Sequence, residues 1–362
     1  ADHNERRSHT SLNRTQGAST EGRDEVRKEG LLCLGVEGTA HTLGMGLVDS
    51  EGKILANVGH SYIPPSGMGI HPREASQHHS DVSGKALRET LRAGGVDASD
   101  IDLIAFSMGP GMGPCLRTAA TIARALSSFL AIPLVGVNHI LAHIEIARHI
   151  TGASDPVVLN VSGGTTQIVV FEKGRYRVFG ETLDIAIGNA FDVFARESGI
   201  YDPSNPWPGP KFVETAARGT KYIELPYLVK GMDLAFSGLV TQALRLLKEG
   251  ERLEDLCYSL QETALAMLTE VTERAMAHTE KRVLLLTGGS ARNRRLQEML
   301  EIMTRERNAE VHVVPPELAT DNGAMIAWTG ILAHKAGITT PIERSYVKPR
   351  WRIEEVRVPW IK

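Results

Sequence analysis

Short apolar runs alternate with turns rich in glycine and polar residues along most of the chain. Three runs near the start are read as strands, at residues 31–36, 43–48 and 53–56. Three more follow in the same order near the middle, at residues 157–161, 167–171 and 176–179. Short apolar or alternating runs bounded by turns are typical of strands. Their recurrence half a chain apart predicts an internal duplication.

Helical periodicity fills the longer segments between these runs. The predicted helices span residues 76–93, 116–130, 138–150, 184–199, 253–280, 293–305 and 322–336. In residues 253–280 the apolar positions form one stripe, so this helix is predicted to lie in the core. Because the 35 glycines suit many tight turns, the pattern as a whole predicts an α/β chain.

Glycine-rich turns at residues 37–42 and 162–166 border two of these strands, and a third turn, at residues 287–290, follows a further apolar run read as a buried strand at residues 283–286. Such turns let backbone N–H groups approach phosphate oxygens closely. Any one of them could be an ordinary tight turn. Three in this order match the duplicated actin-like ATPase fold of sugar kinases and heat-shock ATPases, an α/β fold whose two lobes hold a nucleotide in the cleft between them.

The same pattern predicts how the chain is divided. Residues 1–29 are polar and have only Leu12 and Val26 as sizeable apolar groups, which predicts a disordered extension. The first lobe is expected at residues 30–150 and the second at residues 151–320. A helix returning to the cleft at residues 321–340 and a basic C-terminal segment at residues 341–362 should follow.

Composition excludes some classes of protein. Hydrophobic residues make up 42% of the 362 residues and charged residues 23%, which is ordinary for a globular protein. A net charge of -3 gives no overall nucleic-acid signature, so any RNA contact must use a local patch. Three distant cysteines indicate reduced thiols in a cytoplasmic protein. Neither a secretory signal nor a membrane span is expected.

Two histidines provide the first sign of chemistry. His139 and His143 are four residues apart, so they lie one turn apart on the same helix face and could share a divalent metal. The spacing resembles the zinc-protease pattern HExxH, but Ile140 stands where that pattern has its glutamate base. A purely structural pair is the alternative.

Eight motifs together resemble one known family. They lie at residues 35–42, 70–79, 109–117, 135–139, 161–164, 184–190, 236–239 and 320–325. In this order they are similar to the tRNA N6-adenosine threonylcarbamoyltransferases, the catalytic subunits of the KEOPS complex, in their archaeal and eukaryotic branch. The resemblance covers about residues 31–340.

The resemblance implies an acyl-type transfer. The family moves a threonylcarbamoyl group from threonylcarbamoyl-adenylate to N6 of the adenosine 3′ of the anticodon, in tRNAs that read codons beginning with A, and releases AMP. The implied partners are tRNA, a small atypical kinase/ATPase, a small dimerising subunit and a bridging subunit. A separate synthase would supply the adenylate. Because the chain ends at Lys362, we expect no kinase fused at its C-terminus.

The resemblance also implies a metal site at His139, His143 and Asp321. Two histidines and a carboxylate suit one divalent metal, and we favour Fe(II) over Zn(II). Asp321 could instead, or also, be the N-cap of the helix that follows it. The archaeal family usually has a tyrosine as a further ligand where this chain has Asn160. An amide oxygen is a weaker ligand, so this fourth position is in doubt.

The resemblance implies an adenylate site as well. Its residues are Asn160, Val161, Ser162, Gly163, Gly164, Asp192, Gly209, Pro210, Glu214 and Asn293. Backbone donors of the glycine turn would face the phosphate, Asp192 the ribose, and Asn293 the adenine or ribose. Pro210 stands where the family has a second glycine and removes one N–H donor. Taken singly, Glu214 and Asn293 could be ordinary surface polar residues.

Two residues bordering the first turn, Glu37 and His41, are candidate proton acceptors for the attacking N6. That nitrogen is a poor nucleophile and needs positioning more than deep deprotonation. His71, His78 and His79 could equally serve orientation or surface roles.

The strongest local patch for tRNA is the C-terminal segment. It holds the basic residues Arg344, Lys348, Arg350, Arg352, Arg357 and Lys362, interleaved with Tyr346, Trp351 and Trp360. Such a mixture can pair with phosphates and stack on bases. An ordinary tail that packs its aromatic residues on the body is the alternative. Arg292, Arg294 and Arg295 form a second basic cluster.

Other functions remain as alternatives. A metalloprotease lacks its glutamate at position 140 and leaves the glycine turns unexplained. An ATPase or small-molecule kinase of the same fold seldom needs a site of two histidines and an aspartate. A scaffold that kept the fold but lost activity is suggested by Asn160 and Pro210.

Overall fold

A computed structural model describes residues 30–361, except for residues 66–67 and 201–206. The predicted disordered extension at residues 1–29 and Lys362 of the basic C-terminal segment lie outside the described residues. From Leu31 onward the chain forms one compact unit that contains two five-stranded sheets. The proposed lobe boundaries at residues 150 and 320 stay a prediction.

The first sheet has the order β3-β2-β1-β4-β5. Its strands are β1 (Leu32–Glu37), β2 (Thr42–Asp49), β3 (Ile54–Ser61), β4 (Leu103–Gly109) and β5 (Leu134–Asn138). β1 pairs antiparallel with β2 and parallel with β4. Both β1 and β4 are buried at every position, which explains why β1 reads as a continuous apolar run.

The second sheet repeats this arrangement in the order β12-β11-β6-β7-β8. Its strands are β6 (Val157–Val161), β7 (Thr166–Glu172), β8 (Arg175–Glu181), β11 (Val283–Thr287) and β12 (Glu310–Val313). β6 pairs antiparallel with β7 and parallel with β11, as β1 does with β2 and β4. The predicted duplicated α/β fold is therefore confirmed.

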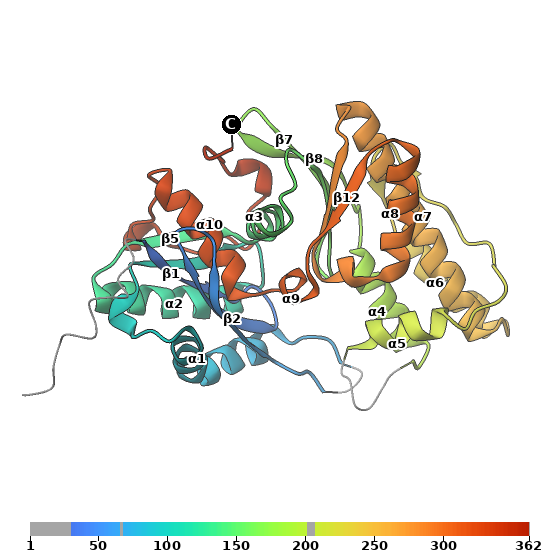
Figure 1. Cartoon of the computed structure of the whole chain (residues 1–362). Helices are drawn as coiled ribbons and strands as arrows, with labels where there is room; N and C mark the ends of the chain where they lie inside the picture. The colour runs from blue at the N-terminus through green and yellow to red at the C-terminus, as the bar shows by residue number, and fades with distance from the viewer. Residues whose placement is uncertain (1–29, 66–67, 201–206, 362) are drawn as a thin grey trace, which may run out of the picture. The chain divides into compact units, whose positions relative to one another are not determined.

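Helices cover both sheets (Figure 1). Those of the first half are α1 (Pro72–Gly94), α2 (Gly113–Leu130) and α3 (His139–Thr151), and α10 (Gly323–Lys335) returns to them. Those of the second half are α4 (Ile187–Glu197), α5 (Pro208–Ala216), α6 (Ser237–Lys248), α7 (Leu253–Thr279), α8 (Arg294–Glu306) and α9 (Pro316–Ala319). A small sheet of β9 (Val229–Lys230) and β10 (Asp233–Leu234) and short 3-10 turns at Ala98–Asp100, Gly289–Arg292, Ile342–Arg344 and Ile353–Glu355 complete the elements. In the first half, α1 and α2 lie on one face of the sheet and α10 lies on the other (Figure 1).

Some elements differ from the predictions. Helix α4 begins at Ile187 instead of Asp184, because the Asp184 carboxylate accepts hydrogen bonds from the backbone N–H groups of Ile185, Phe236 and Ser237. Helices α5 and α6 and strands β4, β5 and β12 were not predicted as elements. The core helix was predicted correctly: α7 buries 15 of its residues.

Helix α10 lies in direct backbone contact with β1 and β2 because glycines line the contact. A Cβ at Gly35 would lie 2.2 Å from the carbonyl oxygen of Gly323, and one at Gly46 would lie 2.3 Å from the backbone nitrogen of Ala324. Carbon atoms in ordinary contact stay roughly 3.5–4.0 Å apart. Only glycine therefore allows α10 this close, and α10 begins two residues after Asp321.

The C-terminal segment joins elements of both halves by backbone hydrogen bonds. Lys348 N–H donates to Met108 O of β4 at 2.7 Å, and Val358 N–H donates to Gly174 O, just before β8, at 2.9 Å. Cys33, Cys115 and Cys257 are buried free thiols. Among the described helices, none is long and apolar enough to cross a membrane.

Candidate metal centre and adenylate site

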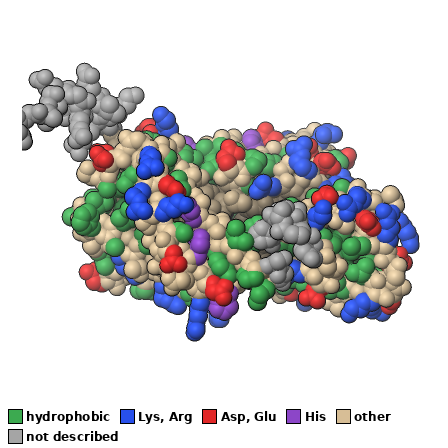
Figure 2. Space-filling model, turned by 90° about the horizontal axis from the view of Figure 1, so that it is seen from below, with side chains coloured by type: hydrophobic (Ala, Val, Ile, Leu, Met, Phe, Trp, Pro, Cys, Tyr) green, Lys and Arg blue, Asp and Glu red, His purple; other side chains and the backbone are tan. Residues whose placement is uncertain are grey.

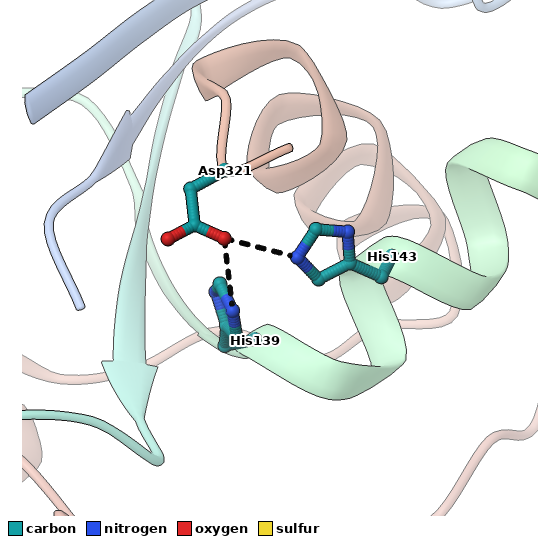
Figure 3. A group of neighbouring side chains, drawn as sticks. All are labelled: His139, His143 and Asp321. Carbon is teal, nitrogen blue, oxygen red and sulfur yellow. Dashed lines mark hydrogen bonds and ion pairs between the residues drawn. The ribbon is translucent and has the colours of Figure 1, made fainter. Parts of the chain in front are cut away.

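His139, His143 and Asp321 lie together although they are far apart in the sequence (Figure 3). His139 Nε2 is 3.4 Å and His143 Nε2 is 3.2 Å from the same atom, Asp321 Oδ1. The two histidines project from the first turns of α3, and Asp321 precedes α10. One face of α3 and the residue before the cap of α10 thus bring three ligand atoms together.

Helix caps position both segments. Asn138 caps α3 by accepting a hydrogen bond from Leu141 N–H at 3.1 Å. Asn322 caps α10 by accepting one from Met325 N–H at 2.9 Å. The idea that Asp321 is the N-cap was therefore wrong, because the neighbouring asparagine fills that role. The Asp321 carboxylate is left to face the histidines.

Glu37 contacts the His139 ring at Nδ1, the nitrogen that does not face Asp321. Its side chain is fully buried and accepts hydrogen bonds from Thr39 N–H at 2.7 Å and Thr39 Oγ1 at 2.5 Å. Its other oxygen lies 3.1 Å from His139 Nδ1. A proton on Nδ1 leaves Nε2 as the atom that faces Asp321, as in the carboxylate–histidine pairs that orient metal ligands. The sequence pointed to Glu37 only as a proton acceptor, which stays a prediction, and missed this orienting contact.

The pKa values of the three residues in the cluster shift in different directions. Burial acts to lower the pKa of His139, but the Glu37 and Asp321 carboxylates outweigh it and raise the pKa to about 9. Burial lowers the pKa of His143, against the opposing effect of Asp321. Burial also acts to raise the pKa of Asp321, yet the two histidines hold it well below its usual range. The carboxylate is therefore ionised, as a metal ligand must be.

The two histidine–aspartate distances fit a single metal ion. Ligand atoms about 2.0–2.2 Å from a tetrahedral ion lie roughly 3.3–3.6 Å from one another, close to the observed 3.2 and 3.4 Å. The His143 side chain is 4% exposed, whereas His139 and Asp321 are 12% and 22% exposed. The cluster thus opens to solvent on the side of His139 and Asp321, where a substrate could enter.

Asn160 lies in β6, opposite Thr287 of β11 and Gln167 of β7. It is buried, and its Nδ2 has no hydrogen-bond partner among the described residues. Its Oδ1 is 2.7 Å from the position that a Cβ at Gly288 would take. The amide therefore packs against the Gly288 turn, and its part in a metal site stays a prediction.

The turn after β6 is exposed at Gly163 and Gly164. Ser162 Oγ accepts hydrogen bonds from Gly164 N–H and Thr165 N–H at 3.3 and 3.0 Å, which fixes the turn after Val161. A Cβ at Gly163 or Gly164 would meet no described atom within 4 Å, so open space lies beside both. At Gly188 a Cβ would lie 2.9 Å from both Ser162 O and Ser290 Oγ. The glycine turns of the second half therefore come together.

Asp192 stands near this turn in α4 and carries a perturbed carboxyl group. Burial raises its pKa to about 6, against the lowering effects of Arg196 and of a hydrogen bond from the Gly209 N–H. A Cβ at Gly209 would lie 3.3 Å from Asp192 Oδ1. The structure thus joins two predicted adenylate residues, and a carboxyl group poised to ionise suits ligand binding.

The other predicted adenylate residues have different contacts. Pro210 is exposed in the first turn of α5. Glu214 is 56% exposed and pairs with Lys211 and Arg218, its neighbours along the chain. Asn293 caps α8 and also donates to Gln261 Oε1 at 3.2 Å. These contacts join none of the three to the metal cluster, and their roles toward the adenylate stay predictions.

His41 and His79 differ in their surroundings and in their nearness to the metal cluster. His41 lies between β1 and β2, and its ring centroid is 4.5 Å from that of Trp207. Burial lowers the pKa of His41, although the Asp321 and Glu37 carboxylates raise it. His79 is fully buried in α1, and burial lowers its pKa to about 4. Of these two histidines, only His41 has its pKa affected by the carboxylates of Asp321 and Glu37.

Some C-terminal aromatic residues pack on the body of the protein, and others remain available to contact tRNA. Trp360 Nε1 donates to the buried carboxylate of Glu145 in α3 at 3.2 Å, so this ring anchors the tail. Tyr346 is 63% exposed, and the ammonium group of Lys348 lies 4.6 Å from the Trp351 ring centroid. A surface pocket of about 430 Å³ is lined by Lys348, Pro349, Arg350, Trp351 and Glu355.

The second basic cluster is less available. Arg295 forms two hydrogen bonds with Glu262, at 2.7 and 2.9 Å, and pairs with Glu298. Acidic and basic side chains are also intermixed on the face that carries α1 and α5 (Figure 2). Any contact with an RNA phosphate backbone must therefore use a local basic patch, as the net charge of -3 indicated.

Comparisons with known proteins agree with these motifs. The sequence model of the tRNA N6-adenosine threonylcarbamoyltransferases matches residues 53–328. A protein of that name from Archaeoglobus fulgidus is 56% identical over 330 residues, covering 91% of this chain and all of the relative. One from Thermofilum pendens is 53% identical over 331 residues, covering 91% of this chain and 97% of the relative.

A third relative is longer. The probable bifunctional tRNA threonylcarbamoyladenosine biosynthesis protein of Methanothermobacter thermautotrophicus is 55% identical over 332 residues, or 92% of this chain. The chain spans 61% of that protein's length.

Solved structures resemble the fold at low sequence identity. Thermococcus kodakarensis HypF has a TM-score of 0.59 at 15% identity, covering 85% of this chain and 48% of HypF. Component A of the Acidaminococcus fermentans (R)-2-hydroxyglutaryl-CoA dehydratase has a TM-score of 0.55 at 13% identity, covering 85% of this chain and all of that one. These likenesses support the actin-like ATPase fold alone.

Proposed function

The chain belongs to the tRNA N6-adenosine threonylcarbamoyltransferase family, and from this premise we propose how its residues carry out the transfer. The threonylcarbamoyl group moves from threonylcarbamoyl-adenylate to N6 of the adenosine 3′ of the anticodon, in tRNAs that read codons beginning with A. N6 forms a bond to the carbamoyl carbon, the bond from that carbon to the phosphate oxygen breaks, and AMP leaves. Neither a metalloprotease nor a small-molecule kinase is favoured by the relatives.

The observation that carries the proposal is the convergence of His139, His143 and Asp321 on one point. We assign these three residues as ligands of one divalent metal, Fe(II) in preference to Zn(II), because two histidines and a carboxylate with open positions are typical of non-heme iron sites. When bound, such an ion would supply Lewis-acid chemistry, neutralising the phosphate and polarising the carbamoyl group. Asn160 stays the proposed, weaker fourth ligand.

Protein groups around this centre would hold the donor in place. Open space beside Gly163 and Gly164 supports phosphate binding at the turn after β6. The partly ionised carboxyl group of Asp192 would accept hydrogen bonds from ribose hydroxyls. Glu214 and Asn293 remain proposed contacts of the adenylate, and Gly209 acts through its hydrogen bond to Asp192.

The N6 proton must leave during the transfer. His41 is the better acceptor of the two candidates, because its lowered pKa keeps the imidazole neutral at physiological pH. Glu37 is already engaged by Thr39 and His139. We therefore assign proton acceptance to His41 and the orientation of His139 to Glu37.

For tRNA, we propose that the exposed part of the C-terminal segment contacts the phosphate backbone. Lys348, Arg350 and Trp351 line one pocket, which supports this placement. The KEOPS subunits, namely a small atypical kinase/ATPase, a small dimerising subunit and a bridging subunit, are proposed partners. A cytoplasmic location is supported by three free cysteines.

One assay tests the function. The protein, threonylcarbamoyl-adenylate, the partner subunits and a matching tRNA are combined, and the modified nucleoside is quantified. We expect His139→Ala and Asp321→Ala to lower turnover at least 100-fold. His278→Ala, which removes an exposed histidine of α7, should leave it unchanged. Wild-type protein that binds metal yet forms no product would refute the function, and unchanged turnover in both variants would refute the metal role.

A further inference from the structure

An aromatic pair connects two distant parts of the chain beside the metal centre. His41, between β1 and β2, and Trp207, just before α5, have ring centroids 4.5 Å apart with an angle of 49° between the rings. Both side chains are half-buried, so each keeps part of its surface open to solvent. The contact therefore presents aromatic surface where ligands can reach it.

The pair lies between the two parts of the proposed site. His41 follows two residues after Thr39, whose Oγ1 lies 3.4 Å from Nδ1 of the proposed metal ligand His139, so this ring stands near the metal centre. Trp207 stands two residues before Gly209, whose N–H donates to Asp192. One ring thus adjoins the metal ligands, and the other adjoins the carboxyl group proposed to hold the donor's ribose.

We propose that the Trp207–His41 pair is the binding site for the base of the acceptor adenosine, which stacks on the exposed part of the indole. This inference rests on the proposed function and identifies where the second substrate binds. Bases in single-stranded RNA loops are commonly held by stacking on aromatic side chains. A base held there would bring its N6 beside His41 and the reacting carbamoyl group, which supplies the positioning that a weak nucleophile needs.

The acceptor suits this pair better than the donor's adenine. The proposed donor contacts, including Ser162, Asp192 and Asn293, all come from the second half of the chain. His41 comes from the first half and belongs to none of these groups. A pair that joins the halves and faces solvent suits a base that is inserted from outside with its RNA.

The test uses an anticodon stem-loop RNA with 2-aminopurine in place of the target adenosine. The fluorescence of 2-aminopurine falls when the base stacks, and anisotropy of a dye at the far end of the stem reports binding. Full-length protein is titrated without donor, together with the partner subunits of the transfer assay. No group transfer takes place, so a failure of the proposed chemistry would leave this measurement unaffected.

Wild-type protein should quench the 2-aminopurine on binding. Trp207→Ala should abolish most of the quenching and weaken binding about 5- to 100-fold, whereas Trp207→Phe should retain most of both. His41→Ala should reduce the quenching in part. Phe129→Ala removes an aromatic side chain that is 86% exposed in α2 and should change neither signal. Thermal unfolding of each variant shows whether it is folded.

Two results would overturn the inference. The first is bound wild-type complex without quenching, or quenching that persists in folded Trp207→Ala. The second concerns the donor's adenine and is measured by calorimetry with AMP. If Trp207→Ala weakens AMP binding and leaves the quenching intact, the pair holds the donor's base instead.

Discussion

Replacing Gly46 with alanine tests whether the contact of α10 with the first sheet sets the geometry of the metal centre. The added Cβ would lie 2.3 Å from the backbone nitrogen of Ala324 and 2.6 Å from the carbonyl carbon of Gly323. Atoms in ordinary contact are roughly 3.5–4.0 Å apart. Because backbone atoms cannot rotate away, the start of α10 must move by about 1 Å.

This displacement is large compared with what a metal site tolerates. Asp321 lies two residues before α10, and ligand distances in metal sites are held to within about 0.2 Å. We therefore expect Gly46→Ala to weaken metal binding on the order of 10- to 100-fold, as the loss of a ligand-orienting group does. Overpacking should also destabilise the fold by about 1–3 kcal/mol.

Metal affinity is measured by competition with a chelator, using Fe(II) and Zn(II), and stability is measured by urea unfolding of the metal-free protein. Gly59→Ala is the matched control in the neighbouring strand β3. Its Cβ would lie 3.6 Å from Thr42 Cγ2, an ordinary contact, so both quantities should stay close to wild type. Wild-type affinity and stability in Gly46→Ala, or equal losses in Gly59→Ala, would refute the reasoning.

Three further predictions concern single side chains. Glu37→Gln removes the charge that holds a proton on His139 Nδ1, so metal affinity measured by chelator competition should fall about 10- to 100-fold; unchanged affinity would contradict the orienting role. The folded-state pKa of Asp192, about 6, lies above the roughly 3.9 of an unfolded chain, so its contribution to stability is complete below the lower value and is lost as the pH rises through about 6. Asp192→Asn should therefore stabilise the protein by about 1–3 kcal/mol at pH 7.5 in urea unfolding, with a smaller gain at pH 5, while transfer activity falls; a gain that does not depend on pH would count against this account. Trp360→Phe removes one of the two donors to Oε2 of the buried Glu145, which keeps its bond from Arg148, and should cost about 1.5–3 kcal/mol in the same assay, whereas an unchanged midpoint would mean that this hydrogen bond does not anchor the tail.

Much of the fold could be predicted from local patterns. Strands β1 and β6 read as apolar runs because they are buried on both faces, and α7 shows its core stripe because helical spacing repeats along the chain. The duplication could be predicted because the same order of turns and strands occurs twice. Strand β12 could not, since it is only four residues long and has no fully buried position.

The histidine pair shows how far the sequence reaches into the site. A spacing of four residues places His139 and His143 on one helix face whatever the rest of the protein does. Only family resemblance suggested that Asp321 would join them. The cap of α10 could not be assigned from sequence, because Asp321 and Asn322 are both good capping residues and only the backbone geometry selects one.

The sequence by itself therefore determined the repeated group of three strands (β1 to β3 and β6 to β8), the repeated turns and the helix face that carries two ligands, because these depend on residues only a few positions apart. The tertiary structure decided that Glu37 orients His139, that Trp360 anchors the tail on α3 and that Trp207 meets His41. It also decided how closely α10 approaches β1 and β2. Each of these contacts joins distant residues, whose distance is set by packing of whole elements and not by any local preference of the chain.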